Sequence, residues 1–134
     1  MENEILTAIE EVKLLLTIIL IIVAVLLLGQ AGKLISRLVV KRTIYRENAF
    51  IHLASKHYEN QEYEELVKYC EEKIEIWGNN PYPFYWLARA KYKLGELEVA
   101  KELFIKVQNI EPEWETTVEP HITKINKTLT RHSS

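Results

Sequence analysis

The feature that most constrains this chain is an uncharged and almost wholly aliphatic run of 19 residues, 14–32. An α-helix rises about 1.5 Å per residue, so the run would extend roughly 28 Å, close to the ~30 Å hydrocarbon core of a bilayer. A soluble helix carries a polar stripe, and none lies between Thr17 and Gln30. A chain of 134 residues is also too small to surround such a helix. The run therefore predicts a transmembrane helix.

A cleaved signal peptide is the competing interpretation, because Gly29 and Ala31 are small residues at a spacing that suits cleavage. Residues 1–13 argue against it, since they carry four Glu and one Lys, whereas a signal peptide begins with basic residues. We therefore interpret residues 14–32 as an uncleaved anchor, preceded by a short interfacial segment over residues 1–13.

The charges on the two sides of the run are unequal. Only Lys13 and the terminal amine precede it, whereas five basic residues and no acid follow it within residues 33–46. The positive-inside tendency predicts a single-pass protein of the inner or plasma membrane with its C-terminal part in the cytoplasm. The five basic residues are Lys33, Arg37, Lys41, Arg42 and Arg46.

Residues 33–46 are predicted to form a basic juxtamembrane helix. Lys33, Arg37 and Lys41 recur every four residues, and aliphatic residues fill the opposite side. These cations can contact anionic lipid head groups, worth about 1 kcal/mol each near the surface. Topology signalling by snorkelling side chains explains the same pattern. Nucleic acid is not an expected partner, because a few cations beside a bilayer, followed by an acidic domain, make a poor track for phosphates.

The rest of the chain repeats itself at a fixed offset, the one that separates Phe50 from Phe84. Apolar residues recur at helical spacing in both copies, so each copy, roughly 47–80 and 81–114, is predicted to be a helical hairpin. Gly95 is expected to end one helix and Pro112 to end the next. The identical pairs are Phe50 and Phe84, Leu53 and Leu87, Ala54 and Ala88, Tyr58 and Tyr92, Glu62 and Glu96, Glu64 and Glu98, and Ile76 and Ile110.

The second copy resembles the tetratricopeptide repeat. The residues that carry the resemblance are Phe84, Leu87, Ala88, Tyr92 (one place later than in the family pattern), Gly95, Ala100, Phe104 and Pro112. The first copy is looser, because Leu66 and Cys70 replace the Ala and Phe, Gln61 replaces the turn Gly and Gly78 replaces the closing Pro. The resemblance covers roughly residues 47–112 and implies stacked antiparallel helices.

Residues 113–134 are predicted to cap the repeats, because stacked repeats usually need about three units to bury a continuous core. Pro120 is expected to kink this helix or to lie in its first turn, and residues 130–134 to fray. The predicted fold class is thus all-α, with a transmembrane helix, two tetratricopeptide hairpins and a capping helix. The side chains expected on the buried side of the cap are Trp114, Val118, Ile122, Ile125 and Leu129.

Catalytic and metal-binding motifs are missing from the sequence. It contains no Asp and a single Cys, and His52 and His57 are five residues apart, so they do not share a helical face as two zinc ligands would. Cys70 occupies the place of Phe104 in the other copy, which predicts a buried core thiol. The sequence predicts a protein that is not an enzyme and that needs no cofactor or metal.

The tetratricopeptide resemblance implies that the first helix of each hairpin lines a concave groove. Tyrosines beside cations suit an extended peptide or helix with apolar and acidic side chains. Packing between the repeats is the alternative role of Tyr58 and Tyr92. The carboxylate clamp of the family is not expected, because it needs Asn and Lys from further repeats. The predicted groove residues are Asn48, Ile51, Ser55 and Tyr58 in the first copy and Tyr82, Tyr85, Arg89, Tyr92 and Lys93 in the second.

The sequence therefore favours a membrane-anchored tetratricopeptide adaptor or assembly factor that binds a protein partner at the cytoplasmic face. The alternative is a small accessory subunit of an integral membrane complex that contacts other spans through its transmembrane helix, although few small residues lie in the span to support close helix packing. A lipid-binding regulator that uses residues 33–46 is a third interpretation. Homo-oligomerisation stays open under each of them.

Overall fold

The computed structural model describes residues 1–132, which form five α-helices and one short 3-10 helix, with no strand among them. The all-α prediction is confirmed. In chain order the elements are α1 (Glu2–Glu59), α2 (Tyr63–Trp77), α3 (Pro81–Lys93), α4 (Leu97–Ile110), the 3-10 helix η1 (Pro112–Trp114) and α5 (Glu115–His132).

The chain divides into two units, Met1–Tyr45 and the part from Arg46 onward. In the first unit every residue is exposed, including the whole uncharged run over residues 14–32. By length and composition α1 can cross a membrane, and it lies near the N-terminus, where a signal sequence has the same properties. The prediction of one helix of membrane-spanning length in this part of the chain is therefore confirmed.

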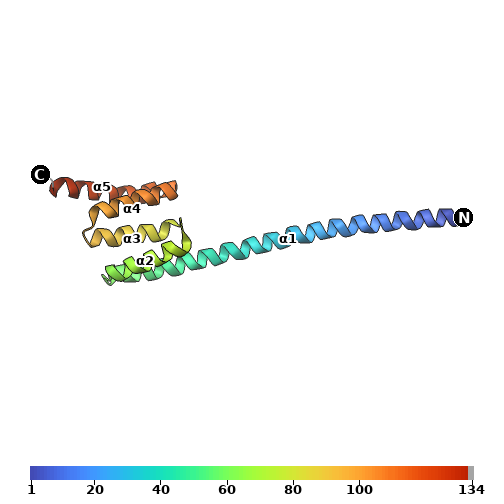
Figure 1. Ribbon diagram of the computed structural model, residues 1–134, viewed down its shortest axis with the longest axis horizontal. Coiled ribbons are helices and arrows are strands. Elements are labelled where there is room, and N and C mark those ends of the chain that lie inside the picture. Colours follow the sequence, from blue (N-terminus) through green and yellow to red (C-terminus); the bar gives the residue numbers. More distant parts are fainter. Residues whose placement is uncertain (133–134) are drawn as a thin grey trace. The chain divides into compact units, whose positions relative to one another are not determined.

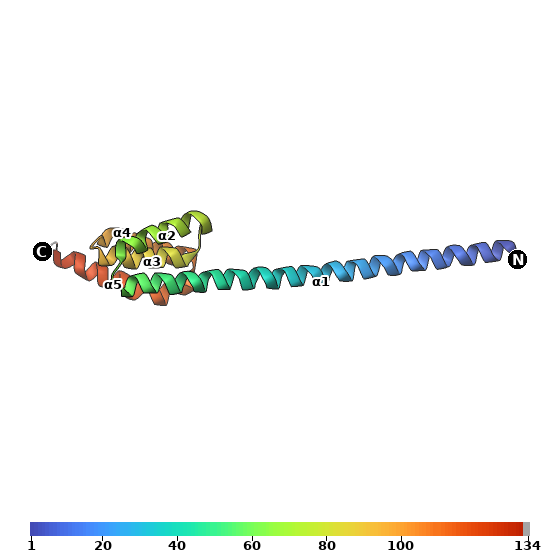
Figure 2. The same ribbon diagram turned by 90° about the horizontal axis from the view of Figure 1, so that it is seen from below.

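In the second unit the helices pack in chain order, with α2 against α3, α3 against α4 and α4 against α5 (Figure 1). Seen from below, α2 and α4 lie along one side of this unit, whereas α5 and the last turns of α1 lie along the other (Figure 2). Helix α4 starts as many residues after the start of α2 as Phe84 lies after Phe50. Helix α5 starts the same number of residues after the start of α3. The period of the sequence is therefore also the period of the structure.

Helix α3 is the central helix of this unit, because it contributes to both hydrophobic clusters. Phe84 and Ala88 pack with α4 and α5, whereas Trp86, Leu87 and Ala90 pack with α2 and the last turns of α1. The remaining buried members are Ala100, Phe104, Val107, Val118, Ile122 and Ile125 in the first cluster and Phe50, Ala54, Leu66 and Cys70 in the second. The prediction of a buried Cys70 is confirmed.

Two turns with the same backbone geometry follow α1 and α3. Gln61 and Gly95, which occupy equivalent positions in the two copies, have φ angles of 63° and 83°. The N–H of Gln61 donates to the carbonyl of Tyr58 and the N–H of Gly95 donates to that of Tyr92, both at 3.2 Å. Since a non-glycine residue adopts a positive φ only at a cost, the shape of the first turn is imposed by the packing of its helices.

The same two turns are each bridged by a contact between a basic side chain and a carboxylate at equivalent positions. His57 Nδ1 lies 2.7 Å from a carboxylate oxygen of Glu62, and Lys91 Nζ lies 3.0 Å from one of Glu96. In both copies, the Glu that precedes the second helix therefore contacts the residue five positions earlier in the chain.

Asn80 fixes the start of α3. Its side-chain oxygen accepts a hydrogen bond from the N–H of Tyr82 at 3.0 Å, and its amide nitrogen donates to Glu47 at 2.8 Å. Pro81 occupies the first helical position, where its missing N–H costs no hydrogen bond. The side chain of Asn80 thus caps the start of α3 and also links α3 to the part of α1 that belongs to this unit.

Helix α5 packs against α4. The five side chains expected on its buried side, from Trp114 to Leu129, all pack in the cluster with α4. Pro120 lies inside α5, beyond the first turn, so of the two predicted alternatives the first-turn position is excluded and the kink stays a prediction. The helix also continues to His132, so the predicted fraying does not begin at residue 130. Residues 133 and 134 lie outside the described residues.

Candidate functional site

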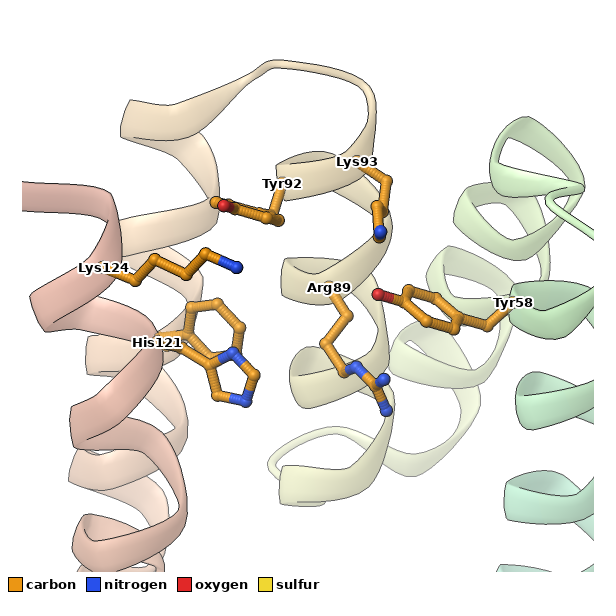
Figure 3. A pocket seen from close by; sticks show the side chains of 7 residues that line it. Tyr58, Arg89, Tyr92, Lys93, His121 and Lys124 are labelled. Carbon is orange, nitrogen blue, oxygen red and sulfur yellow. The ribbon is translucent and has the colours of Figure 1, made fainter. Parts of the chain in front are cut away.

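A cavity of about 100 Å³ lies in the second unit, between the last turns of α1 and the facing sides of α3 and α5 (Figure 3). Tyr58 of α1 lines it on one side and His121 and Lys124 of α5 line it on the other. Helix α4 contributes the ring of Phe104. The remaining lining residues, Arg89, Tyr92 and Lys93, come from α3.

Three cations line this cavity, and no carboxylate does. Within residues 1–132, Arg89, Lys93 and Lys124 take part in no ion pair, because the carboxylates that are paired contact His57, Lys73 and Lys91 instead. Arg89 is half-buried and Lys93 and Lys124 are exposed, and like charges that share a small space repel one another. We call these three residues the cation cluster.

The guanidinium of Arg89 is held by aromatic rings. It lies 4.1 Å from the ring centroid of Tyr58, 4.6 Å from that of Trp86 and 5.7 Å from that of Tyr85. Each ring attracts the cation through its negative face, worth about 0.5–1 kcal/mol at an exposed site. The rings accept no strong hydrogen bond, so they orient the guanidinium and leave its N–H donors available for an anion.

The two lysines of the cluster also lie beside tyrosine rings. Lys93 Nζ is 5.7 Å from the ring centroid of Tyr58, and Lys124 Nζ is 5.4 Å from that of Tyr92. The cluster is therefore built from cations on α3 and α5, with aromatic rings beside them.

His121 lies at the side of the cavity. Its ring stacks on Phe104, with centroids 4.7 Å apart, and its Nε2 lies 3.4 Å from the hydroxyl oxygen of Tyr85. Burial lowers the pKa of His121 below its ordinary value, and the positive charges of Arg89 and Lys124 lower it further. The imidazole is therefore held mainly in its neutral form at pH 7.

Four of the nine predicted groove residues line the cavity: Tyr58, Arg89, Tyr92 and Lys93. A fifth, Tyr85, lies beside it through its contact with His121.

The other four predicted groove residues are not brought to the cavity. The ring of Tyr82 packs edge-on against Trp114 at 5.0 Å. Ile51 is half-buried against the cluster of α1, α2 and α3, the Ser55 hydroxyl donates to the carbonyl of His52 at 2.9 Å, and Asn48 is exposed.

Sequence reasoning missed Phe104, His121 and Lys124 as lining residues. A signal for α5 was present, because Val118 and Ile122 follow Phe84 and Ala88 at the offset of the repeat and are buried as they are. The period of the sequence thus continues from α3 into α5, so the polar residues of α5 become candidates for the same site as those of α3.

The predicted membrane-surface residues divide between the two units. Lys33, Arg37, Lys41 and Arg42 lie in the first unit and are exposed. Arg46 belongs to the second unit, where its guanidinium lies 5.0 Å from the ring centroid of Trp77. Its charge is thus engaged by a ring of its own unit.

Among the described residues, no group of three His, Cys, Asp or Glu side chains is placed to hold a metal ion. Burial raises the pKa of the Cys70 thiol well above its ordinary value, which disfavours the reactive thiolate. The candidate site of this protein is accordingly the cavity with its cation cluster, and the chemistry that it offers is the binding of an anion.

Comparison with known proteins adds no assignment. No family model matches the chain, and no curated protein matches it.

Proposed function

We propose that this protein is a membrane-anchored adaptor or assembly factor whose second unit binds a protein partner at the cytoplasmic face of the membrane. The observation that carries the proposal is the cation cluster of Arg89, Lys93 and Lys124, which faces a cavity and has no carboxylate partner in the described part of the chain. A partner that offers acidic groups would supply the missing charge. The tyrosines beside the cluster would add apolar contact.

The repeated geometry of the second unit supports a tetratricopeptide arrangement. The helix starts follow the period of the sequence, and equivalent residues form equivalent turns and equivalent contacts with a Glu carboxylate in both copies. In that family the first helices of the repeats form the concave binding face. The corresponding helices here are the last turns of α1, α3 and α5, and side chains from all three line the cavity.

The first unit supports the anchoring part of the proposal. Its aliphatic run is exposed throughout and long enough to span a bilayer, and the five basic residues that follow it favour a cytoplasmic location for the second unit. An anchored binding unit would hold its partner at the membrane surface, where the local concentration of other membrane-bound components is high.

The test is the capture of partners by the full-length protein, purified from native membranes in a mild detergent. The variant Arg89→Glu with Lys93→Glu reverses two charges of the cluster and is expected to lose the captured partner. The matched control, Lys68→Glu with Lys127→Glu, reverses two exposed charges that do not line the cavity and should retain it.

A third variant, in which residues 14–28 are replaced by poly-Leu, separates the two function classes. The adaptor proposal requires that this variant still captures the partner. Capture that survives the charge reversal but is lost with poly-Leu would favour the accessory subunit, because specificity would then reside in the span.

A further inference from the structure

The cavity is suited to a particular kind of anion, because of the number and position of its donors. Three cationic side chains, Arg89, Lys93 and Lys124, reach it from two helices. The hydroxyls of Tyr58 and Tyr92 belong to the same lining and, in residues 1–132, neither has a hydrogen-bond partner (Figure 3). The cavity therefore offers charged and neutral donors that the chain itself does not use.

From this donor set we infer that the cavity binds a phosphate monoester, through Arg89, Lys93 and Lys124. A phosphate monoester carries about −1.5 to −2 charges at pH 7 and three strong acceptor oxygens, so three cations can be paired at once. A carboxylate carries one charge on two oxygens and would leave cations of the cluster unpaired. The three positive charges thus favour a phosphate dianion over a carboxylate.

The size of the cavity limits the ligand. Its volume of about 100 Å³ is a few times the ~30 Å³ that one water occupies in the liquid. A single phosphate group fits such a space, and the rest of the molecule that carries it would extend into solvent, where Lys93 and Lys124 are exposed. The carrier is thus a phosphorylated side chain of a protein or another small phosphate ester.

The electrostatic state of His121 agrees with this assignment. Arg89 and Lys124, from different helices, both lower the pKa of this imidazole, which indicates that their positive potentials overlap inside the cavity. The contacts of Arg89 with the rings of Tyr58, Trp86 and Tyr85 orient the guanidinium before any ligand arrives, which lowers the entropic cost of binding.

When the phosphate belongs to a protein partner, the inference rests on the function proposed above. The test needs no partner. Loss of phosphate binding with partner capture intact would overturn this inference alone, and loss of capture with phosphate binding intact would overturn the adaptor proposal alone.

The experiment is calorimetric titration of the full-length protein in a maltoside detergent and a phosphate-free buffer. The ligands are inorganic phosphate, acetate, and a short phosphoserine peptide beside its unphosphorylated form. We expect phosphate to bind at least about tenfold more tightly than acetate, and the phosphorylated peptide to bind at least about tenfold more tightly than the unphosphorylated one. A phosphopeptide that binds more tightly than free phosphate identifies a protein side chain as the source, and the reverse order identifies a small phosphate ester.

The variant Lys93→Gln with Lys124→Gln should weaken phosphate binding by at least about tenfold, since it removes two charged donors. The control Lys68→Gln with Lys127→Gln removes the same charge outside the cavity and should leave binding unchanged. To exclude a folding defect, Lys93→Arg with Lys124→Arg keeps both charges and should keep binding. The inference is overturned by equal weakening in the Gln pairs, by acetate binding as tightly as phosphate, or by an absence of saturable phosphate binding.

Discussion

The two copies of the repeat in the second unit obey one pattern, but they are buried to different extents. In the second copy, α3 buries six residues, whereas the part of α1 that belongs to the first copy buries only Phe50 and Ala54. The reason is position in the stack, because α3 lies between two hydrophobic clusters and α1 contributes to one. Equivalent sequence positions in a repeat therefore carry unequal weight in stability when one of them lies at the end of the stack.

The largest expected difference between the copies concerns the Leu pair. Leu87 is 6% exposed and Leu53 is 37% exposed, although they occupy equivalent positions. We expect Leu87→Ala to lower the free energy of unfolding by about 2–5 kcal/mol, because it leaves a cavity in the core. Leu53→Ala should cost less than about 1 kcal/mol, because much of that side chain already contacts solvent.

The measurement is urea unfolding of the full-length protein in detergent micelles, followed by tryptophan fluorescence. Trp77, Trp86 and Trp114 are the three tryptophans of the chain, and all lie in the second unit, so the signal does not report on the first. Equal losses for the two substitutions would break the comparison, since they would mean that the first copy is covered as completely as the second.

The turns give a smaller effect of opposite sign in the two copies. Gly95→Ala should destabilise the second unit by about 1 kcal/mol, because a Cβ is unfavourable at a φ of 83°. Space is not the cause, since a Cβ on Gly95 would meet no atom within 4 Å. Gln61→Gly should stabilise the unit by up to about 1 kcal/mol, because it relieves the same strain at a φ of 63°.

The same unfolding experiment tests both turn substitutions. A destabilising Gln61→Gly would show that the entropy that glycine gains in the unfolded chain outweighs the relief of strain, and that the two turns differ energetically despite their equal geometry.

The smallest expected effect is a pH dependence of the free energy of unfolding, and it comes from His121 of α5. Burial, followed by the charges of Arg89 and Lys124, lowers the pKa of His121 from 6.5 in the folded chain. The unfolded chain therefore binds this proton more readily, so the free energy of unfolding should fall as the pH drops from about 7.5 through 6.5 and below. His121→Gln should reduce this dependence.

Unfolding midpoints of the parent protein and His121→Gln at several pH values between 5 and 8 provide the measurement. Every other ionisable group of the chain is common to both proteins, so the difference between the two curves isolates His121. Parallel curves would contradict the prediction, because they would mean that the folded and unfolded chains bind the proton of His121 equally.

Much of this architecture could be predicted from the sequence, because it depends on local spacing. An uncharged run of 19 residues is long enough to span a bilayer wherever it occurs, and helical periodicity with a regular repeat places the helices and the buried Phe50, Phe84 and Cys70. The side of α5 that packs, from Trp114 to Leu129, also follows from its period.

The site depended on the tertiary structure. Periodicity states which side of a helix is apolar, but it does not state which polar residues of two helices face each other across a cavity. His121 and Lys124 line the same cavity as Arg89 because α5 packs against α4, which packs against α3. Tyr82, predicted in the same groove as Arg89, packs against Trp114 instead. The sequence determined the helices and the composition of their faces, since both follow from local spacing. Only packing decided which charges share a cavity, because contacts between residues far apart in the sequence depend on how whole helices stack.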